Sequence, residues 1–384
     1  MFKRSLSVLI LIILGSGVTA AFGQTATSAP PAGQTPKPPK PVSPPPKTEK
    51  TSPTTPAPRA PIEEQEKIDP VNVKLGRGGK VAISIRSGQI FVSGWDRDIV
   101  QASAAGESGA VPIETQTTGD PSRPRLLLTV AGRRYGRDAR LDVKVPRYAD
   151  VETLEFNRGE IDVADVEGAT LINLGNGDVK VMRVGSLKVS RRSGDVTVGE
   201  VKGDVIARSY NGDINVSSIT GLVDISATNG DLNIHNAGGD VRANSLTGDV
   251  NVRCAKGRAD VSSASGSISL IGIGGDVEAS TASGDVTFVA PIRAGGSYRL
   301  KSLSGGVSMT IQPDVAGFTA SLTTYSGGID TGFPLKVETP GQGGPLNRRI
   351  NGVFGNGQAK LSLDSFSGTV TIAKGTAAAL KECK

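Results

Sequence analysis

Histidine, cysteine and aromatic residues are scarce in this chain of 384 residues. It contains one histidine, two cysteines and one tryptophan, and aromatic residues make up 4% of it. With a single histidine, His235, any histidine-based triad or multi-histidine metal site would have to use that residue. Few aromatic side chains also mean few platforms on which bases could stack, and the net charge of +6 is small. We therefore expect no nucleic-acid partner.

Long apolar runs are rare as well, and the clearest one lies at the start of the chain. Lys3 and Arg4 precede an apolar stretch from Leu6 to Leu14, and small residues follow up to Gly23. This order is typical of a secretory signal peptide, so we assign residues 1–23 to one and expect export to the periplasm, the cell surface or the medium. The alternative is an uncleaved inner-membrane signal anchor with a periplasmic head, because residues 6–22 nearly reach the ~20 that a membrane span needs.

Residues 24–68 are rich in proline and lysine. More than half of the chain's 23 prolines lie here, in runs such as residues 44–46. A segment of this composition cannot bury an apolar core, and we predict a disordered, extended linker.

Glycine is abundant and regularly spaced. From Gly185 to Gly284 a glycine occurs at every ninth residue, and the third and fifth positions of nearly every nine-residue unit are apolar. Two apolar residues separated by one polar residue have the period of a β-strand. Each unit therefore predicts one short strand and a corner at the glycine.

The units alternate between two kinds. Units that begin at Gly194, Gly212 and Gly230 follow Ser or Asn and carry a small polar residue at position four, whereas the units between them do not. The true repeat is therefore a coil of about 18 residues with two unlike strands. Like strands one coil apart would stack in parallel about 4.8 Å from each other. The predicted fold is all-β, a parallel β-solenoid.

Aspartate usually follows the glycine in one kind of unit. On stacked coils these residues would form an exposed structural column, in which each carboxylate bonds a nearby backbone N–H. The column comprises Gly194, Asp195, Gly212, Asp213, Gly230, Asp231, Gly248, Asp249, Gly284 and Asp285.

The folded part divides into three regions on its glycine spacing. We assign residues 69–150 to an N-terminal β cap with opening coils, 151–296 to the regular solenoid, 297–375 to irregular C-terminal coils with a cap, and 376–384 to a tail. Residues 104–123 resemble a loop in the cap. Residues 332–358, rich in glycine and proline, are the expected surface excursion, and they contain Arg348 and Arg349.

Catalytic and metal sites find little support. One face of the predicted solenoid carries Asp224, Asp260 and Glu278, with Arg242 among them. The charges of this row differ in sign from coil to coil, which indicates reduced repulsion between stacked coils rather than a lyase or hydrolase site. Calcium β-rolls need the motif Gly-Gly-x-Gly-x-Asp, in which Asp lies two residues after the last glycine, whereas here Asp directly follows the glycine and a second glycine is usually absent. We predict no catalytic, cofactor or metal residues. Whether Cys254 pairs with Cys383 stays open.

A resemblance covers residues 71–374. The order of Gly94-Trp95-Asp96, the repeated Ser/Asn/Thr-Gly-Asp-Val units and Ser367-Gly368-Thr369 resembles the bacterial putative adhesin family of domains of unknown function. The resemblance implies an exported β-solenoid without assigned catalytic residues.

Taken together, the sequence predicts a non-catalytic, exported solenoid that presents an extended surface to a protein or glycan of the cell envelope or surface. A periplasmic envelope-structural or stress-related scaffold is the alternative. A glycan-active β-helix enzyme is a third and weaker one.

Overall fold

The computed structural model describes residues 69–107, 109–120, 122–130, 139–337, 348–375 and 383. The predicted signal peptide and linker lie outside these residues, as does the predicted tail apart from Cys383. No helix in the described ranges is long and apolar enough to cross a membrane.

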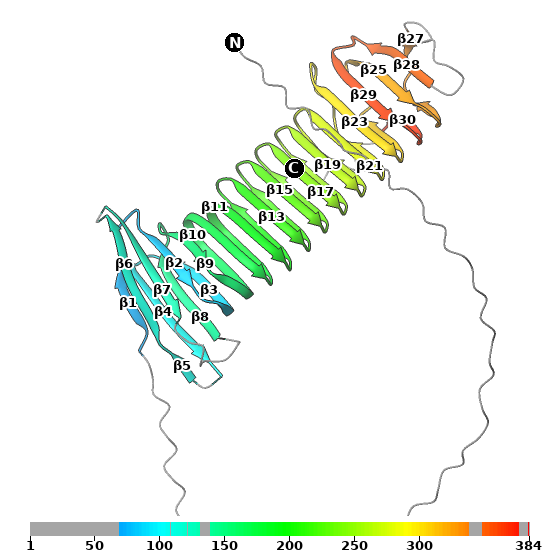
Figure 1. The fold of residues 1–384 in the computed structure, drawn as a ribbon. Helices are drawn as coiled ribbons and strands as arrows, with labels where there is room; N and C mark the ends of the chain where they lie inside the picture. Colours follow the sequence, from blue (N-terminus) through cyan, green and yellow to red (C-terminus); the bar gives the residue numbers. More distant parts are fainter. Residues whose placement is uncertain are drawn as a thin grey trace, which may run out of the picture. The chain divides into compact units, whose positions relative to one another are not determined.

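The described chain is a parallel β-solenoid, as predicted (Figure 1). Its coils contribute strands to two stacked columns, and successive strands within a column are parallel and usually 18 residues apart. The even column comprises β12 (Val196–Val201), β14 (Ile214–Ile219), β16 (Leu232–Ala237), β18 (Val250–Ala255), β20 (Ile268–Ile271), β22 (Val286–Val289), β24 (Val307–Ile311), β30 (Val370–Lys374) and β26 (Ile329–Thr331). The odd column comprises β13 (Val205–Asn211), β15 (Val223–Asn229), β17 (Val241–Thr247), β19 (Ala259–Ser265), β21 (Val277–Ser283), β23 (Ser297–Ser304), β29 (Ala359–Ser365) and β25 (Gly317–Thr324).

Two long strands open the regular coils and run through both columns. They are β10 (Phe156–Asn176) and β11 (Val179–Ser193), and their register shifts between Val166 and Ala169. The shift shortens one coil from 18 to 17 residues, so Gly177 and Gly194 still stack despite the missing residue. The bulge therefore absorbs the break in the glycine spacing.

The core lies between the two columns. Positions three and five of each unit point inward and are buried, as at Val196 and Val198. In the odd column the seventh residue of each unit, counted with the glycine as the first, also points inward. This residue is usually a serine or threonine, whose hydroxyl donates to the carbonyl oxygen of a corner glycine. Thr281 Oγ1 donates to Gly266 O at 2.8 Å, and Ser302 Oγ donates to Gly284 O at 2.7 Å. The glycine carbonyls at the corner thus satisfy the hydrogen-bonding needs of these buried hydroxyls.

Glycine is required for different reasons in alternate units. Gly212, Gly230 and Gly248 have φ of +107°, +127° and +135°, and they form the corner from the odd to the even column. At Gly203 and Gly239 the φ is not positive, but an added Cβ would lie 2.7 and 2.6 Å from the carbonyl oxygen of the glycine one coil earlier. Half of the repeat glycines therefore supply a positive φ, and at the other half the close approach of the coils excludes a side chain.

The other corner uses non-glycine residues in the left-handed region. Glu200, Ser218, Asn236 and Cys254 have φ between 56° and 58°, each one coil from the next. Gly272 follows in the same place with φ 70°. Because the left-handed residue turns the chain, the residue after it, such as Val201, points back into the core.

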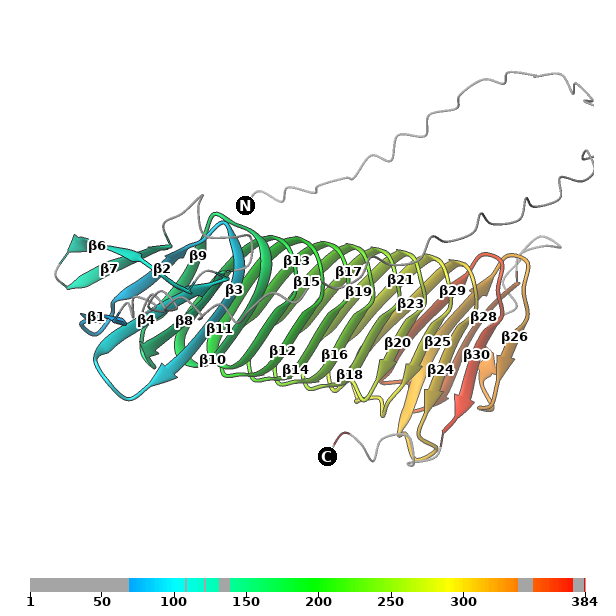
Figure 2. The same cartoon turned by 90° about the horizontal axis from the view of Figure 1, so that it is seen from below.

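Antiparallel strands join the solenoid at its N-terminal end (Figure 2). This region contains β1 (Val71–Lys74), β2 (Lys80–Ser84), β3 (Ser87–Trp95), β4 (Ile99–Gly106), β5 (Gly109–Val111), β6 (Ile113–Asp120), β7 (Arg123–Val130), β8 (Ala139–Pro146) and β9 (Asp150–Leu154). Strand β8 extends the even column in parallel through β3, and β4 then pairs antiparallel with β8 and β1. Strand β2 extends the odd column between β9 and β7, and β6 pairs antiparallel with β7.

The predicted loop at residues 104–123 is wrong. Strands β5 and β6 occupy most of it as antiparallel partners of β4 and β7. Seven of the eight residues of β6 are exposed, so its side chains lack the alternation that reveals a half-buried strand.

The predicted excursion at residues 332–358 is partly a β-structure. Strands β27 (Lys336–Val337) and β28 (Arg348–Gly355) are antiparallel to each other, and β28 pairs with β25. Ile350 and Phe354 pack against the core from β28. The glycine-rich composition obscured the alternation of inward and outward side chains in β28. Residues 338–347 of the predicted excursion lie outside the described ranges.

The two cysteines form a disulfide. Cys254, near the end of β18, is bonded to Cys383, with the Cα atoms 5.1 Å apart and a sequence separation of 129. A Cβ on Gly272 would lie 2.5 Å from Cys383 Sγ, so this glycine leaves room for the bond. The pairing that the sequence left open is therefore made, and it attaches the C-terminus to the even column.

We predict that Gly230→Ala lowers the free energy of unfolding by at least about 2 kcal/mol. Its φ is +127°, and the new Cβ would lie 2.3 Å from Gly212 O, so the methyl group both strains the corner and separates two coils. Urea unfolding measures the change. Gly76→Ala is the control, because no atom lies within 4 Å of its added Cβ. Equal effects of the two substitutions would contradict this account of the corner.

Candidate binding surface

The aspartate column forms a ladder between coils. The backbone N–H of Asp213 donates to Asp195 Oδ1 at 3.0 Å, that of Asp231 to Asp213 Oδ1 at 2.9 Å, and that of Asp249 to Asp231 Oδ1 at 2.8 Å. Ser267 takes the next place, and Asp285 accepts from Gly306 N–H at 2.7 Å. The predicted bond from each carboxylate to a nearby backbone N–H is therefore made to the next coil rather than within the same turn. The carboxylates are exposed.

A buried arginine lies beneath the first carboxylates of this ladder. Arg191 is 6% exposed and occupies the inward position that serine or threonine takes in most other coils. Its Nη2 donates to the carbonyl oxygen of Asp213 at 3.2 Å. Burial lowers the pKa of Arg191, while the charges of Asp195, Asp178 and Asp213 oppose that change. The guanidinium therefore offsets part of the negative charge of the column from inside the coil.

The outward face of the odd column carries the charged row. Asp224, Arg242, Asp260 and Glu278 lie in register on β15, β17, β19 and β21. Arg208 binds both carboxylate oxygens of Asp224, at 2.9 and 3.1 Å, and Arg258 binds Glu278 at 3.0 Å. Hydrogen bonds from Arg208 lower the pKa of Asp224. Two of these three carboxylates are therefore engaged by arginines, and Asp224, whose pKa is lowered, is a poor general acid.

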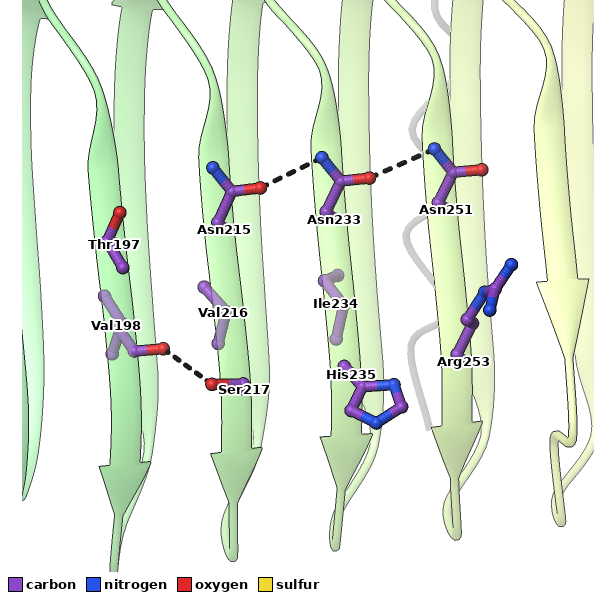
Figure 3. A pocket seen from close by; sticks show the side chains of 10 residues that line it. All are labelled: Thr197, Val198, Asn215, Val216, Ser217, Asn233, Ile234, His235, Asn251 and Arg253. Carbon is purple, nitrogen blue, oxygen red and sulfur yellow. Dashed lines mark hydrogen bonds between the residues drawn. The ribbon is translucent and has the colours of Figure 1, made fainter. Parts of the chain in front are cut away.

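The outward face of β14, β16 and β18 in the even column is rich in amides. Asn233 Nδ2 donates to Asn215 Oδ1 at 3.0 Å, and Asn251 Nδ2 donates to Asn233 Oδ1 at 3.1 Å (Figure 3). These three side chains line a surface hollow of ≈ 470 Å³ together with Ser217, His235 and Arg253. Each amide in the row keeps a second N–H and a second lone pair, so the row can bind hydroxyl or amide groups of a ligand.

His235 is part of this face and lies between Ser217 and Arg253 in register. Figure 3 shows its ring beside the amide row, partly exposed. Among the described residues no group of three or more His, Cys, Asp or Glu side chains has a geometry that could hold a metal ion. The sequence pattern had identified the small polar residues at position four, but not their bonding from coil to coil.

Arg348 and Arg349 begin β28 and are both exposed. Arg349 Nε donates to Asn351 Oδ1 at 3.3 Å, and its Nη2 donates to Ser321 Oγ at 3.4 Å. The two arginines lie on a strand at the C-terminal end of the odd column, away from the amide row of β14, β16 and β18.

Comparison with known proteins gives one family match and two similar solved structures. The profile of the family described as Toastrack DUF4097 matches residues 129–271 and again residues 254–373. No curated protein matches the chain significantly. Two solved structures align with 80% of it: a "putative cell adhesion protein" from Clostridium sporogenes, 9% identical over 100% of its length (TM-score 0.18), and a "putative adhesin" from Bacteroides fragilis, 14% identical over 97% of its length (TM-score 0.24).

The aspartate ladder can be tested at Asp231. We expect Asp231→Ala to lower the free energy of unfolding by about 1 kcal/mol, because Asp249 N–H loses its acceptor. Asp231→Asn keeps an acceptor and removes one of several stacked like charges, so it should match or exceed the wild type at low salt. Urea unfolding at two ionic strengths measures both, and salt should reduce any gain. A loss in Asp231→Asn as large as in Asp231→Ala would show that charge, not the acceptor, matters.

The Arg208–Asp224 pair predicts a pH dependence. The pKa of Asp224 is lower in the folded than in the unfolded chain, so the pair stabilises the fold at pH above the unfolded value of about 3.9. This contribution is lost as the pH falls through the folded pKa. Asp224→Asn should therefore lower Tm at pH 7, and the difference from the wild type should shrink in acid. The control is Asp260→Asn, in the same row, because Asp260 has no ion pair in the described ranges. A difference that stays constant from pH 7 into acid would contradict the prediction.

Proposed function

We propose, from the premise that the chain belongs to the Toastrack DUF4097 family, that it is an exported, non-catalytic protein whose solenoid presents rows of side chains for adhesion to a protein or glycan. The observation that carries the proposal is the in-register stacking of outward side chains. It repeats the same chemistry on strand after strand, as in the amide row of Asn215, Asn233 and Asn251. A repeated row fits a repetitive or extended partner better than a single small substrate.

Two further features support export and attachment. The first residues have the order of a secretory signal, and a proline-rich segment follows before the folded part. The disulfide between Cys254 and Cys383 is typical of proteins that fold in an oxidising compartment. A solenoid on an extended linker could reach a partner at a distance from the point of attachment.

The arrangement of charged residues supports binding over catalysis. Glycan-cleaving enzymes use two carboxylates around one sugar linkage, one of them protonated. Here Asp224 and Glu278 are paired with Arg208 and Arg258 along a row, rather than converging on a hollow. The amide-lined hollow of the even column contains one titratable base, His235, and one cation, Arg253.

The proposal predicts that the folded part is accessible on intact cells. We expect protease added to whole cells to remove an epitope inserted in the solenoid, and deletion of the protein to reduce attachment of the cells to envelope or host-surface material. A cytoplasmic protein assayed on the same cells controls for lysis. Resistance to protease until the envelope is opened would favour the periplasmic scaffold instead. Product formation from any glycan that the purified full chain binds would contradict the non-catalytic role.

A further inference from the structure

Exposed apolar side chains are concentrated on one row of the odd column. Seven large hydrophobic residues in the described ranges are exposed, and five of them belong to this row. Their exposed fractions are 55% for Tyr210, 55% for Leu246, 50% for Leu303, 50% for Phe366 and 42% for Tyr325. Such a concentration contrasts with the scattered single residues that surfaces normally show.

The strand register places these residues one after another. The row passes through β13, β15, β17, β19, β21 and β23, and then through the residues that follow β29 and β25. We name it the apolar ridge, and its members in spatial order are Tyr210, Thr228, Leu246, Ala264, Ala282, Leu303, Phe366 and Tyr325. The rings of Phe366 and Tyr325 stack with centroids 4.8 Å apart and planes 3° from parallel. The ridge therefore runs over eight successive positions, with Thr228, Ala264 and Ala282 between the large apolar side chains.

Two polar rows run parallel to the apolar ridge at the glycine corner. The first consists of uncharged hydroxyl and amide side chains, namely Asn211, Asn229, Thr247, Ser265, Ser283 and Ser304. The second, beyond the corner glycines, is the aspartate column, whose carboxylates are exposed. A ligand on the ridge thus meets apolar groups, then hydroxyls and amides, then hydrogen-bond acceptors.

The charges restrict the class of ligand. A polyanion would be repelled by the stacked carboxylates of the column, which are spaced by one coil. Two copies joined ridge to ridge would bring two such columns together, which disfavours self-association. On the other side of the ridge, Arg208 is held by Asp224, and Lys301 is in register with Asp364. The surroundings therefore favour an uncharged ligand rich in hydroxyl groups.

A hollow continues the ridge at its N-terminal end. In the same row, the residues before Tyr210 are Arg192 and Gly175, and an added Cβ on Gly175 would lie 2.3 Å from Asn157 O. Because Gly175 lacks a side chain, the row is interrupted there. A hollow of ≈ 750 Å³ opens at this place, lined by Glu155, Asn157, Asn173, Arg192 and Tyr210 among others. It combines the Tyr210 ring with amides, one carboxylate and the two arginines Arg191 and Arg192. Its size is in the range of small-molecule sites, roughly 300–1,000 Å³.

We infer that the apolar ridge and this hollow bind a linear, uncharged polysaccharide that lies along the stacked coils. The faces of a sugar ring carry C–H groups, which match the aromatic and aliphatic side chains of the ridge, and its hydroxyl groups match the two polar rows. One end of the chain enters the hollow, where the amides and the Arg192 and Glu155 side chains bond its hydroxyls. The inference rests on the proposed binding function and specifies both its surface and its ligand class.

The test compares glycan binding by the full chain and by surface variants. Cellohexaose and chitohexaose serve as uncharged probes and an oligogalacturonate of the same length as the anionic one, with affinities from isothermal titration calorimetry. The ridge variant combines Tyr210→Ser, Leu246→Ser and Phe366→Ser, which are exposed and should leave the fold intact. We expect at least one uncharged probe to bind the wild type and to lose about tenfold or more in affinity in the ridge variant.

Two control variants make the result specific. Ile99→Ser with Val337→Ser removes the two large hydrophobic residues that are exposed outside the ridge in the described part of the chain, and should change the affinity by less than about twofold. The second control variant combines Asn215→Ala, Asn233→Ala and Asn251→Ala, and it removes the amide row of the even column. If only the amide-row variant lost binding, the assignment of the binding site to the apolar ridge would be wrong, while the proposed adhesive function would stand.

Other outcomes would overturn the inference outright. They are the absence of binding to either uncharged hexaose, tighter binding of the oligogalacturonate, and a change from oligomer to monomer in the ridge variant by sedimentation velocity. The last result would identify the ridge as a contact between copies. Binding to envelope or host proteins in the absence of glycan binding would leave the proposed adhesive function standing on another surface.

Discussion

The close approach of main chains between successive coils is the constraint on which the structure depends. At the corner, an added Cβ on Gly248 would lie 2.2 Å from the carbonyl oxygen of Gly230 one coil earlier, so only glycine allows the ladder of backbone hydrogen bonds to continue around the bend. The inward hydroxyls of Ser263 and Thr281 then bond the corner carbonyls, and the outward aspartates bond the next coil. Backbone, interior and surface are thereby held to the same 18-residue register.

This register also explains how surface chemistry becomes extended. Once the coils are in step, a residue type that recurs every 18 positions becomes a row with the spacing of strands in a sheet, about 4.8 Å. The amide row, the aspartate column and the apolar ridge arise in this way from unremarkable single residues. Their neighbouring side chains interact, as Asn233 does with Asn215, so each row is partly ordered before any ligand arrives.

Much of the fold could be predicted because local and long-range signals coincide in the repeat. The glycine at every ninth residue and the paired apolar positions identify both the strands and their parallel stacking. Prediction failed in strands that lack this combined signal. Strand β6 is exposed along most of its length and shows no apolar alternation, and in β28 the glycines obscure the inward positions of Ile350 and Phe354. The left-handed corner at Glu200 and Ser218 was also missed, since these residue types carry no backbone signal of their own.

The surface illustrates a different limit. The residues of the aspartate column could be identified from sequence, yet their bonding could not, because an Asx turn and a bond to the next coil use the same residue. The apolar ridge was harder still, since Tyr210 and Leu303 are 93 positions apart in the numbering and the coils between them hold threonine and alanine. The exposed tyrosine, leucine and phenylalanine side chains of this row face solvent without adding to the core. Folding alone gives no reason for those side chains to share one row, whereas contact with an extended partner does.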